Sequence, residues 1–277
     1  MHPELLNITW LHYNFTIKAY SFFIVLAAVS VTGLGLCAAL GRGLPKKRAA
    51  LCLVAMGLAA PLGARLLHLA TNPQYYAMEP SRILSLHAQG FSLYGGLLAA
   101  ALTGLVTCRA LSINAWRMAD AMAPAMGVGI AFMRVGCYLN GCCYGKVTTL
   151  PWGVTFPLNS PAAGKQLSGG FMFFLQGIQP VHPTQLYEML AALVGTGLAA
   201  LILRRKAPDG AAFLTFILWF TAFRWLNSYL RVSATTLNVP EYFYPFFYSL
   251  ILLLALGLLL GRLKSATMGH LIKREAG

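Results

Sequence analysis

The residues best suited to chemistry lie in one stretch, residues 133–156, which reads MRVGCYLNGCCYGKVTTLPWGVTF. A hydrophobic run leads into Arg134, and a glycine-rich polar segment containing Cys137, Cys142 and Cys143 follows. Arginine offers a planar fork of donors to phosphate or carboxylate, and glycine lets backbone N–H groups approach a ligand. The pattern indicates an anion site at a membrane surface. A plain helix end followed by a glycine-rich loop is the alternative.

Arg134 is one of several charged residues that lie within or at the ends of hydrophobic segments. They include Arg65, Arg134, Glu188, Arg224 and Arg231. A charge at bilayer depth costs roughly 3 kcal/mol or more unless it is paired or lines a polar cavity. Arg224 and Arg231 are seven residues apart and therefore share a helix face. Several arginines with one carboxylate favour an anionic ligand such as a phospholipid head group. Snorkelling of Arg231 and internal pairing of Glu188 are the alternatives.

Two short motifs bring polar groups to the starts of hydrophobic segments. HPTQLYE at 182–188 places His182 and Tyr187 beside a proline and a threonine, which suit a first helical turn. FSLYGG at 91–96 places the phenol of Tyr94 beside a glycine pair. An interfacial histidine and an aromatic anchor are the plainer interpretations of these motifs.

The composition indicates the kind of scaffold that positions these residues. Of 277 residues, 58% are hydrophobic and 10% charged, whereas a soluble domain has about 25% charged residues. We therefore predict an all-α integral membrane protein, one polytopic domain over 1–277 without a cleavable signal peptide. The seven predicted transmembrane segments are 17–40, 49–71, 91–108, 118–138, 184–203, 211–231 and 245–261.

The basic residues predict the orientation of the chain in the membrane. Most of the 21 Lys and Arg residues fall in loops that lie on one side if all seven segments span. These loops are 42–48, 109–117, 204–209 and the C-terminal tail. By the positive-inside rule this side is cytoplasmic, so the N-terminus is outside and the C-terminus inside. The net charge of +14 thus needs no nucleic-acid partner. The largest outward loop, about 139–183, is predicted to be a small extracytoplasmic insertion.

One acidic residue is predicted at the cytoplasmic side. Asp120 lies near the cytoplasmic end of its segment. We expect it to pair with Arg117 or to cap a helix.

The block at 134–156 and the HPTQLYE motif at 182–188 resemble the signature motifs of the prolipoprotein diacylglyceryl transferase family. Supporting matches are Gly63-Ala64-Arg65, Tyr94-Gly95-Gly96, Phe223-Arg224, Arg231 and Tyr20. The resemblance covers nearly the whole chain and includes seven helices with an outward N-terminus. It implies transfer of a diacylglyceryl group from phosphatidylglycerol to the lipobox cysteine of a prolipoprotein signal peptide, with release of glycerol phosphate. It also implies the bacterial inner membrane, and no metal or organic cofactor.

The resemblance assigns roles to individual residues. Arg134 and Arg224 would hold the lipid phosphate and stabilise charge on the leaving group, which makes them catalytic. Tyr94 and His182 would be the further catalytic residues. Those that would bind and shape the substrate are Tyr20, Arg65, Gly95, Gly96, Asn140, Gly145, Tyr187, Glu188 and Arg231.

The chain departs from the family pattern at several site positions. At Tyr94, Cys137, Cys142 and Val181 many members have histidine, asparagine, glutamate and arginine, and they have a glutamate near Ser228. A phenol has a pKa near 10, so Tyr94 could activate a thiol only if strongly perturbed. His87 or His182 could replace it as the base.

Three other interpretations stay open. The chain could be a paralogue that passes the same lipid group to another acceptor, or a lipid or anion transporter without catalysis, although no internal repeat supports a transporter. Cys137, Cys142 and Cys143 could bind a metal or form a disulfide, but their spacing is not a standard zinc pattern. We favour simple packing among glycines for Cys142 and Cys143.

Overall fold

A computed structural model describes residues 4–10, 13–83, 90–168, 177–205, 207–232 and 243–275. Its long helices are α1 (Ala19–Gly41), α2 (Lys46–Thr71), α4 (Leu93–Ala110), α5 (Ala115–Asn140), α8 (Thr184–Arg204), α9 (Ala211–Ser228) and α10 (Phe243–Glu275). The short elements are β1 (Glu4–Trp10), β2 (Tyr13–Lys18), α3 (Pro73–Ala77), the 3₁₀ helix η1 (Pro80–Ile83) and α6 (Pro161–Leu167).

Each predicted hydrophobic segment coincides with one of the seven long helices. Six of them are long and apolar enough to cross a bilayer, namely α1, α2, α4, α5, α8 and α10. Helix α9 is not among these six and carries Arg224 and Asn227 in its final turns. The prediction of a helical multi-pass membrane protein is therefore confirmed. Two predicted ends were wrong, because α9 stops at Ser228 rather than 231 and α10 continues to Glu275 rather than 261.

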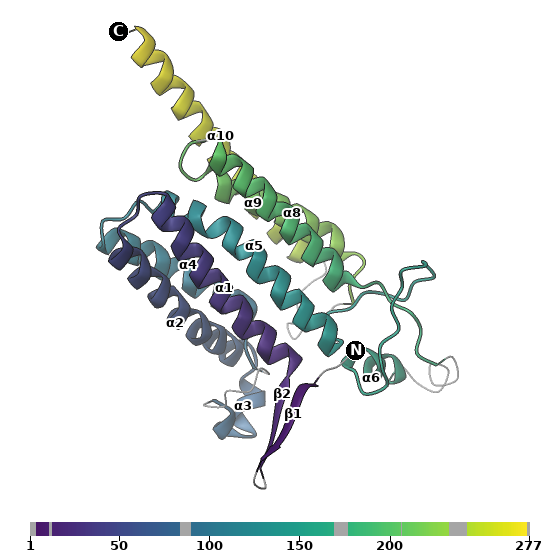
Figure 1. Ribbon diagram of the computed structural model, residues 1–277. Coiled ribbons are helices and arrows are strands. Elements are labelled where there is room, and N and C mark those ends of the chain that lie inside the picture. Colours follow the sequence, from purple (N-terminus) through teal and green to yellow (C-terminus); the bar gives the residue numbers. More distant parts are fainter. Residues whose placement is uncertain are drawn as a thin grey trace.

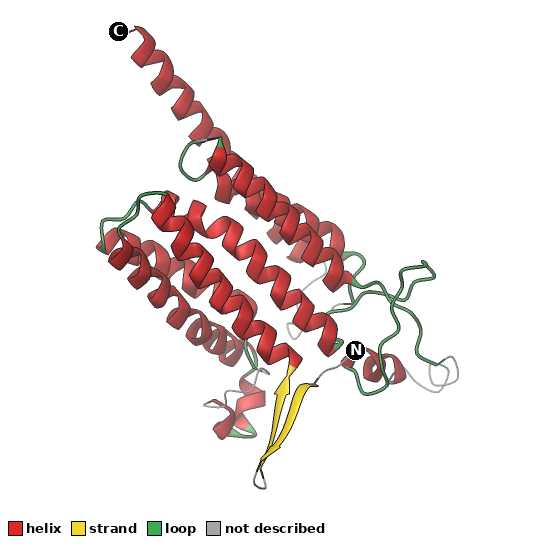
Figure 2. Cartoon of the chain, in the orientation of Figure 1, coloured by secondary structure: helices red, strands yellow, loops and turns green. Residues whose placement is uncertain are grey.

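Helix α5 lies at the centre of the bundle (Figure 1). It packs against α1, α8 and α9, while α2 pairs with α4 on one side and α10 packs against α9 on the other. The antiparallel hairpin of β1 and β2 leads into α1, at the same end as α6, and was not predicted from the sequence. Among the described residues these two strands are the only extended strand pair (Figure 2).

Both ends of α5 follow from local sequence. At its start the side chain of Asn114 accepts hydrogen bonds from the backbone N–H groups of Trp116 and Arg117, which is N-capping. At its end Gly141 adopts a left-handed conformation, with φ of +69°. Glycine tolerates this conformation without steric cost and commonly terminates helices. The cysteine-containing segment thus begins where α5 must stop.

The segment after α5 folds back on two other parts of the chain. Gly145 pairs with Arg231, and both Val147 and Val154 pair with Val181, each as an antiparallel bridge. Beneath these bridges Tyr144, Phe156, Ala162 and Val181 form a small buried cluster. The segment after α5 therefore has a small core of its own. Its bridges to Val181 and Arg231 connect it to the start of α8 and the end of α9.

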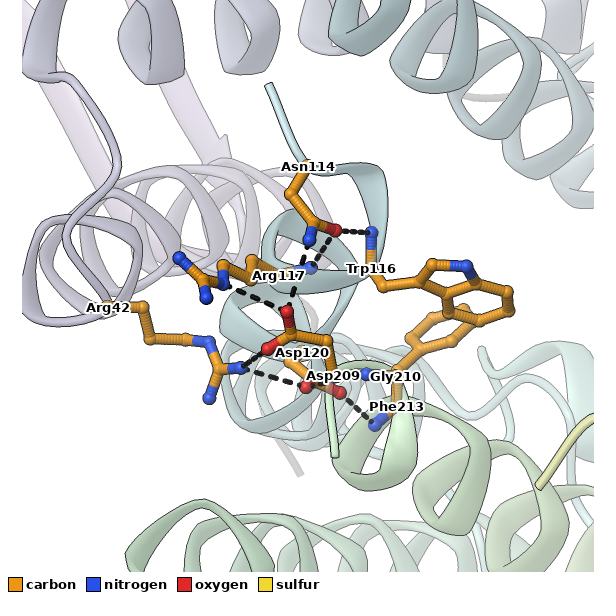
Figure 3. A network of polar contacts seen from close by, with 8 residues as sticks. All are labelled: Arg42, Asn114, Trp116, Arg117, Asp120, Asp209, Gly210 and Phe213. Carbon is orange, nitrogen blue, oxygen red and sulfur yellow. Dashed lines mark hydrogen bonds and ion pairs between the residues drawn. The ribbon is translucent and has the colours of Figure 1, made fainter. Parts of the chain in front are cut away.

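At the opposite end of α5, Asp120 joins three helices (Figure 3). Its carboxylate accepts hydrogen bonds from the backbone N–H groups of Gly210 and Phe213 at 2.9 Å, so it caps α9 from a neighbouring helix. Its ionic partner is Arg42 at 3.1 Å. The predicted cap is confirmed, but the predicted partner was wrong because Arg117 instead binds Asp209.

Candidate functional site

Three of the predicted arginines converge on the carboxylate of Glu188. Glu188 Oε2 lies 2.6 Å from Arg134 Nη2, and both carboxylate oxygens lie 2.8 Å from Arg224 Nη1. Arg231 Nη1 lies 3.6 Å from Glu188 Oε1. The side chain of Asn227 donates a further hydrogen bond to Oε1 at 3.1 Å. We call Arg134, Glu188, Arg224, Asn227 and Arg231 the arginine–glutamate cluster.

Three helices and the segment after α9, which contains Arg231, supply this cluster. Arg134 stands in the last two turns of α5, Glu188 in the second turn of α8, and Arg224 near the end of α9. The start of α8 is fixed to the cysteine segment, since Thr184 Oγ1 donates to the Cys143 carbonyl and Gln185 Nε2 donates to the Cys142 carbonyl, both at 2.7 Å. The HPTQLYE motif is thus hydrogen-bonded directly to the signature block at 134–156.

The cluster is buried and carries an excess of positive charge. The side chains of Glu188 and Arg134 are only 2% and 5% exposed. Three guanidinium groups face one carboxylate, which leaves two positive charges uncompensated by the ion pairs found among the described residues. Arg134 Nε is buried without a hydrogen-bond partner in that part of the chain. Buried donors with surplus positive charge favour binding of an anion.

A group of polar side chains adjoins Arg134. Its Nη1 donates to Cys137 Sγ at 3.8 Å, and the phenol of Tyr20 on α1 interacts with both Arg134 and the cysteines. The Asn140 side chain hydrogen-bonds with Cys142. Tyr20 and Asn140 therefore lie in the same neighbourhood as the cluster.

Cys143 is the most strongly polarised thiol outside the spanning helices. Hydrogen bonds with the sulfurs of Cys137 and Cys142, aided by the guanidinium groups of Arg231 and Arg134, lower the pKa of Cys143 well below its usual value. Its backbone φ of +64° is uncommon for a residue with a side chain.

Tyr94 also reaches the cluster. Its phenol interacts with the guanidinium of Arg224. Its ring packs edge-to-face against Phe247 on α10, with 6.2 Å between centroids. Tyr94 on α4 and Phe247 on α10 therefore meet beside Arg224.

His182 and Tyr187 form a pair at the start of α8. The Tyr187 hydroxyl accepts a hydrogen bond from Trp152 Nε1 at 2.8 Å and lies 3.3 Å from His182 Nδ1. The backbone N–H of Gly145 donates to the His182 carbonyl at 2.9 Å. Gly145 leaves no room for a side chain, because a Cβ atom there would lie 2.6 Å from the His182 Cβ.

The remaining predicted binding residues lie elsewhere. Gly95 and Gly96 are buried where α4 meets α2, and a Cβ atom on Gly95 would lie 2.3 Å from the Gly63 carbonyl oxygen. Arg65 stacks on Phe91 at 4.0 Å and donates to the Tyr76 hydroxyl at 3.3 Å. No ion pair between Arg65 and Glu188 is found among the described residues. His87, the other possible base, lies outside them.

Sequence analysis missed Asn227 and Gln185. Asn227 is 3% exposed and fixes Glu188 to the Thr184 carbonyl, while Gln185 holds the cysteine segment. A signal for both existed, because each lies three residues from a charged member of the cluster, Arg224 or Glu188, and so shares its helix face.

These observations define a multi-pass helical membrane protein with a buried arginine–glutamate cluster at one end of its bundle. Comparison with known proteins gives its relatives. The chain belongs to the prolipoprotein diacylglyceryl transferase family, whose model matches residues 7–268.

Curated relatives carry the name phosphatidylglycerol–prolipoprotein diacylglyceryl transferase. The protein of Geobacter sulfurreducens is 37% identical over 61% of this chain and 60% of its own length. That of Mannheimia succiniciproducens is 31% identical over 56% of this chain and 52% of its own length. That of Bacillus cereus is 28% identical over 79% of each. The chain thus spans only about half to three fifths of the length of the first two relatives.

Proposed function

We propose that this protein transfers a diacylglyceryl group from phosphatidylglycerol to the lipobox cysteine thiol of a prolipoprotein signal peptide. Glycerol phosphate is the second product. Membership in the family and the names of the relatives support this reaction. The observation that carries it is the convergence of Arg134, Arg224 and Arg231 on the single carboxylate of Glu188.

The charge of the cluster suits the leaving group of this reaction. The acceptor sulfur attacks the glycerol carbon that bears the phosphate ester, so a C–S bond forms and the C–O bond breaks. The electron pair stays on the phosphate oxygen, and the thiol proton passes to a base. The phosphodiester has one negative charge, and a phosphate monoester has about two. Two uncompensated guanidinium charges therefore favour the departing group over the bound lipid, which is the condition for catalysis.

In this proposal each side chain has a distinct task. Arg134 and Arg224 bind the phosphate, and Arg231 adds charge beside them. Glu188 and Asn227 position these arginines. Tyr20, Asn140 and Gly145 shape the neighbouring surface.

We assign the base to His182 rather than Tyr94. Imidazole accepts a proton near neutral pH, whereas a phenol does so only in its ionised form. The interaction of Tyr94 with Arg224 supports a part in orienting the phosphate-binding guanidinium. Tyr187, which lies next to His182, would hold the imidazole in place.

The proposal includes the contacts predicted away from the cluster. Arg65 would hold part of the lipid near α2, and Gly95 and Gly96 would let α4 approach α2 closely enough to form that surface. The close contact of Gly95 with Gly63 supports this role of the glycine pair.

We further propose that all seven long helices span the bacterial inner membrane, with the N-terminus outside and the C-terminus in the cytoplasm. Arg134 follows Asp120 by fourteen residues, about 21 Å along α5. Arg42 and Asp209, which pair with each other beside Asp120, belong to the basic loops 42–48 and 204–209, so this end of α5 is the end that carries those loops. The positive-inside rule then puts the arginine–glutamate cluster and the insertion at about 139–183 in the outer half.

The test is transfer by the purified protein in detergent, with phosphatidylglycerol and a lipobox peptide as substrates. Mass spectrometry reads the peptide and the released glycerol phosphate together. We expect a diacylglyceryl mass on the cysteine and an equal amount of glycerol phosphate. Glycerol phosphate without modified peptide would point to a paralogue with another acceptor. Lipid binding with neither product would contradict catalysis.

A further inference from the structure

Three thiols that the proposed reaction does not use gather at the end of α5. The Sγ atoms of Cys137, Cys142 and Cys143 all lie within 4.8 Å of one another. Cys137 is buried, and the other two are partly exposed. In a tetrahedral zinc site, sulfurs at about 2.3 Å from the metal are roughly 3.8 Å apart. Small side-chain rotations would therefore bring all three sulfurs to one ion.

The backbone holds the three cysteines in this arrangement. Gly141 ends α5 in a left-handed turn, and Cys143 also has a positive φ, of +64°. The carbonyl groups of Cys142 and Cys143 are each fixed at 2.7 Å by side chains from the start of α8. A residue with a side chain seldom adopts this conformation, and such residues occur more often at functional sites.

The surrounding charge favours thiolates, which are the form that binds metals. Arg134 Nη1 donates to Cys137 Sγ at 3.8 Å, and Arg231 acts on Cys143. Among the described residues of the cluster, Arg224 adds a third guanidinium, and Glu188 compensates only one of the three positive charges. Three thiolates with a monovalent or divalent cation carry a net negative charge, which the surplus guanidinium charge would balance.

We propose that Cys137, Cys142 and Cys143 form a three-thiolate site for one thiophilic d¹⁰ metal ion, Zn²⁺ or Cu⁺. Soft thiolate ligands select these ions, and Zn²⁺ would keep a fourth position for a further ligand. On binding, each S–H proton that remains is released to solvent and a sulfur–metal bond replaces it, with no change in oxidation state. The proposal does not rest on the proposed transfer reaction, although Arg134 and Arg231 lie beside both sites.

The six cysteines allow a matched pair of variants. One variant replaces the three distant cysteines, Cys37→Ser, Cys52→Ser and Cys108→Ser, and keeps the proposed ligands. The other, Cys142→Ser with Cys143→Ser, changes the two less buried ligands and keeps the distant three. The distant set is a demanding control, because Cys52 and Cys108 also have sulfurs 3.7 Å apart.

The 277-residue chain is purified in detergent, reduced and freed of metal with a chelator. It is then titrated with Zn²⁺ or Cu⁺ against a chromophoric competitor. Elemental analysis after desalting gives the metal per chain, and melting temperature reports folding. We expect about one ion per chain in the unmodified protein and the distant-cysteine variant. In the double variant we expect affinity at least about tenfold lower, since even outer-shell partners of a metal site have that effect.

The ion that binds more tightly identifies the metal, and tight binding of either Zn²⁺ or Cu⁺ supports the site. Equal binding by the folded double variant, or loss of binding in the distant-cysteine variant, would overturn the proposal. So would no binding by the reduced protein, including the case in which mass spectrometry finds two of the three thiols joined in a disulfide before reduction.

Discussion

Both carboxylate oxygens of Glu188 on α8 lie 2.8 Å from the same guanidinium nitrogen of Arg224 on α9. Arg134 approaches the same carboxylate from α5 at 2.6 Å. One acidic side chain therefore holds together three helices and the charge that would bind a lipid phosphate. Stability and activity should both depend on it, although for different reasons.

Replacing Glu188 by glutamine should strongly destabilise the fold. The substitution keeps the shape but leaves Arg134 buried without its counter-charge, and breaking a buried ion pair costs about 3–5 kcal/mol. Thermal unfolding in detergent measures the effect. Glu79→Gln is the control, because its pair with Arg82 is exposed and such pairs contribute about 0–1 kcal/mol. Equal melting temperatures for the two variants would contradict a structural role for Glu188.

Asp120→Asn should lower stability without slowing transfer. Asp120 is 1% exposed, and its two oxygens accept the N–H groups that begin α9. An amide offers only one acceptor oxygen, so one buried N–H loses its partner at a cost of about 1–3 kcal/mol. Unfolding and transfer are measured on the same folded sample. An unchanged stability, or a clearly reduced transfer rate in the folded variant, would contradict a purely structural role for Asp120.

Much of the fold could be predicted from the sequence because apolar helices leave a strong compositional pattern. All seven long helices were located, and α9 was found despite Arg224. The ends of α9 and α10 were not, because the apolar pattern continues past Ser228, whereas α10 continues past its apolar stretch as a polar helix to Glu275. The N-terminal hairpin was missed because the residues between its strands carry no Gly, Asn or Pro turn signal and a long apolar helix follows directly.

The charged residues of the cluster could be named from the sequence, whereas its neutral partners Asn227 and Gln185 could not. A buried arginine is conspicuous in an apolar segment, whereas Asn227 and Gln185 are ordinary residues until their partners are known. Sequence spacing alone also could not distinguish Arg65, which stacks on Phe91, from the arginines that reach Glu188. Likewise, the pairing of Asp120 with Arg42 joins residues far apart in the chain.

Cys143 should react as a thiolate at lower pH than an ordinary cysteine. Hydrogen bonds with Cys137 and Cys142, and then the guanidinium groups, lower its pKa, so the thiolate persists as pH falls below about 8.5, the value for a free thiol. The rate of alkylation against pH, on chelator-treated protein with peptide mapping, gives the midpoint. Arg231→Gln should move that midpoint upward. A midpoint at or above that of free cysteine would refute the argument.

His182→Gln and Tyr94→Phe should separate the base from the orienting phenol. Loss of a general base typically reduces a rate by about 10²–10⁴-fold. We expect that loss for His182→Gln and a much smaller one for Tyr94→Phe, with transfer to a lipobox peptide as the measurement. The reverse order of effects would assign the proton transfer to Tyr94 instead.

The most direct test of the central claim is the transfer rate of Arg224→Ala beside that of Arg82→Ala. Arg224 is 20% exposed, and Glu188 keeps Arg134 and Arg231 as partners, so the variant should fold. Arg82 is an exposed arginine that pairs with Glu79 away from the cluster. Losing one preorganised group that stabilises developing charge costs about 10²–10³-fold in rate, and we predict this loss for Arg224→Ala and an unchanged rate for Arg82→Ala. A folded Arg224→Ala protein that transfers at the unmodified rate would contradict the proposed site.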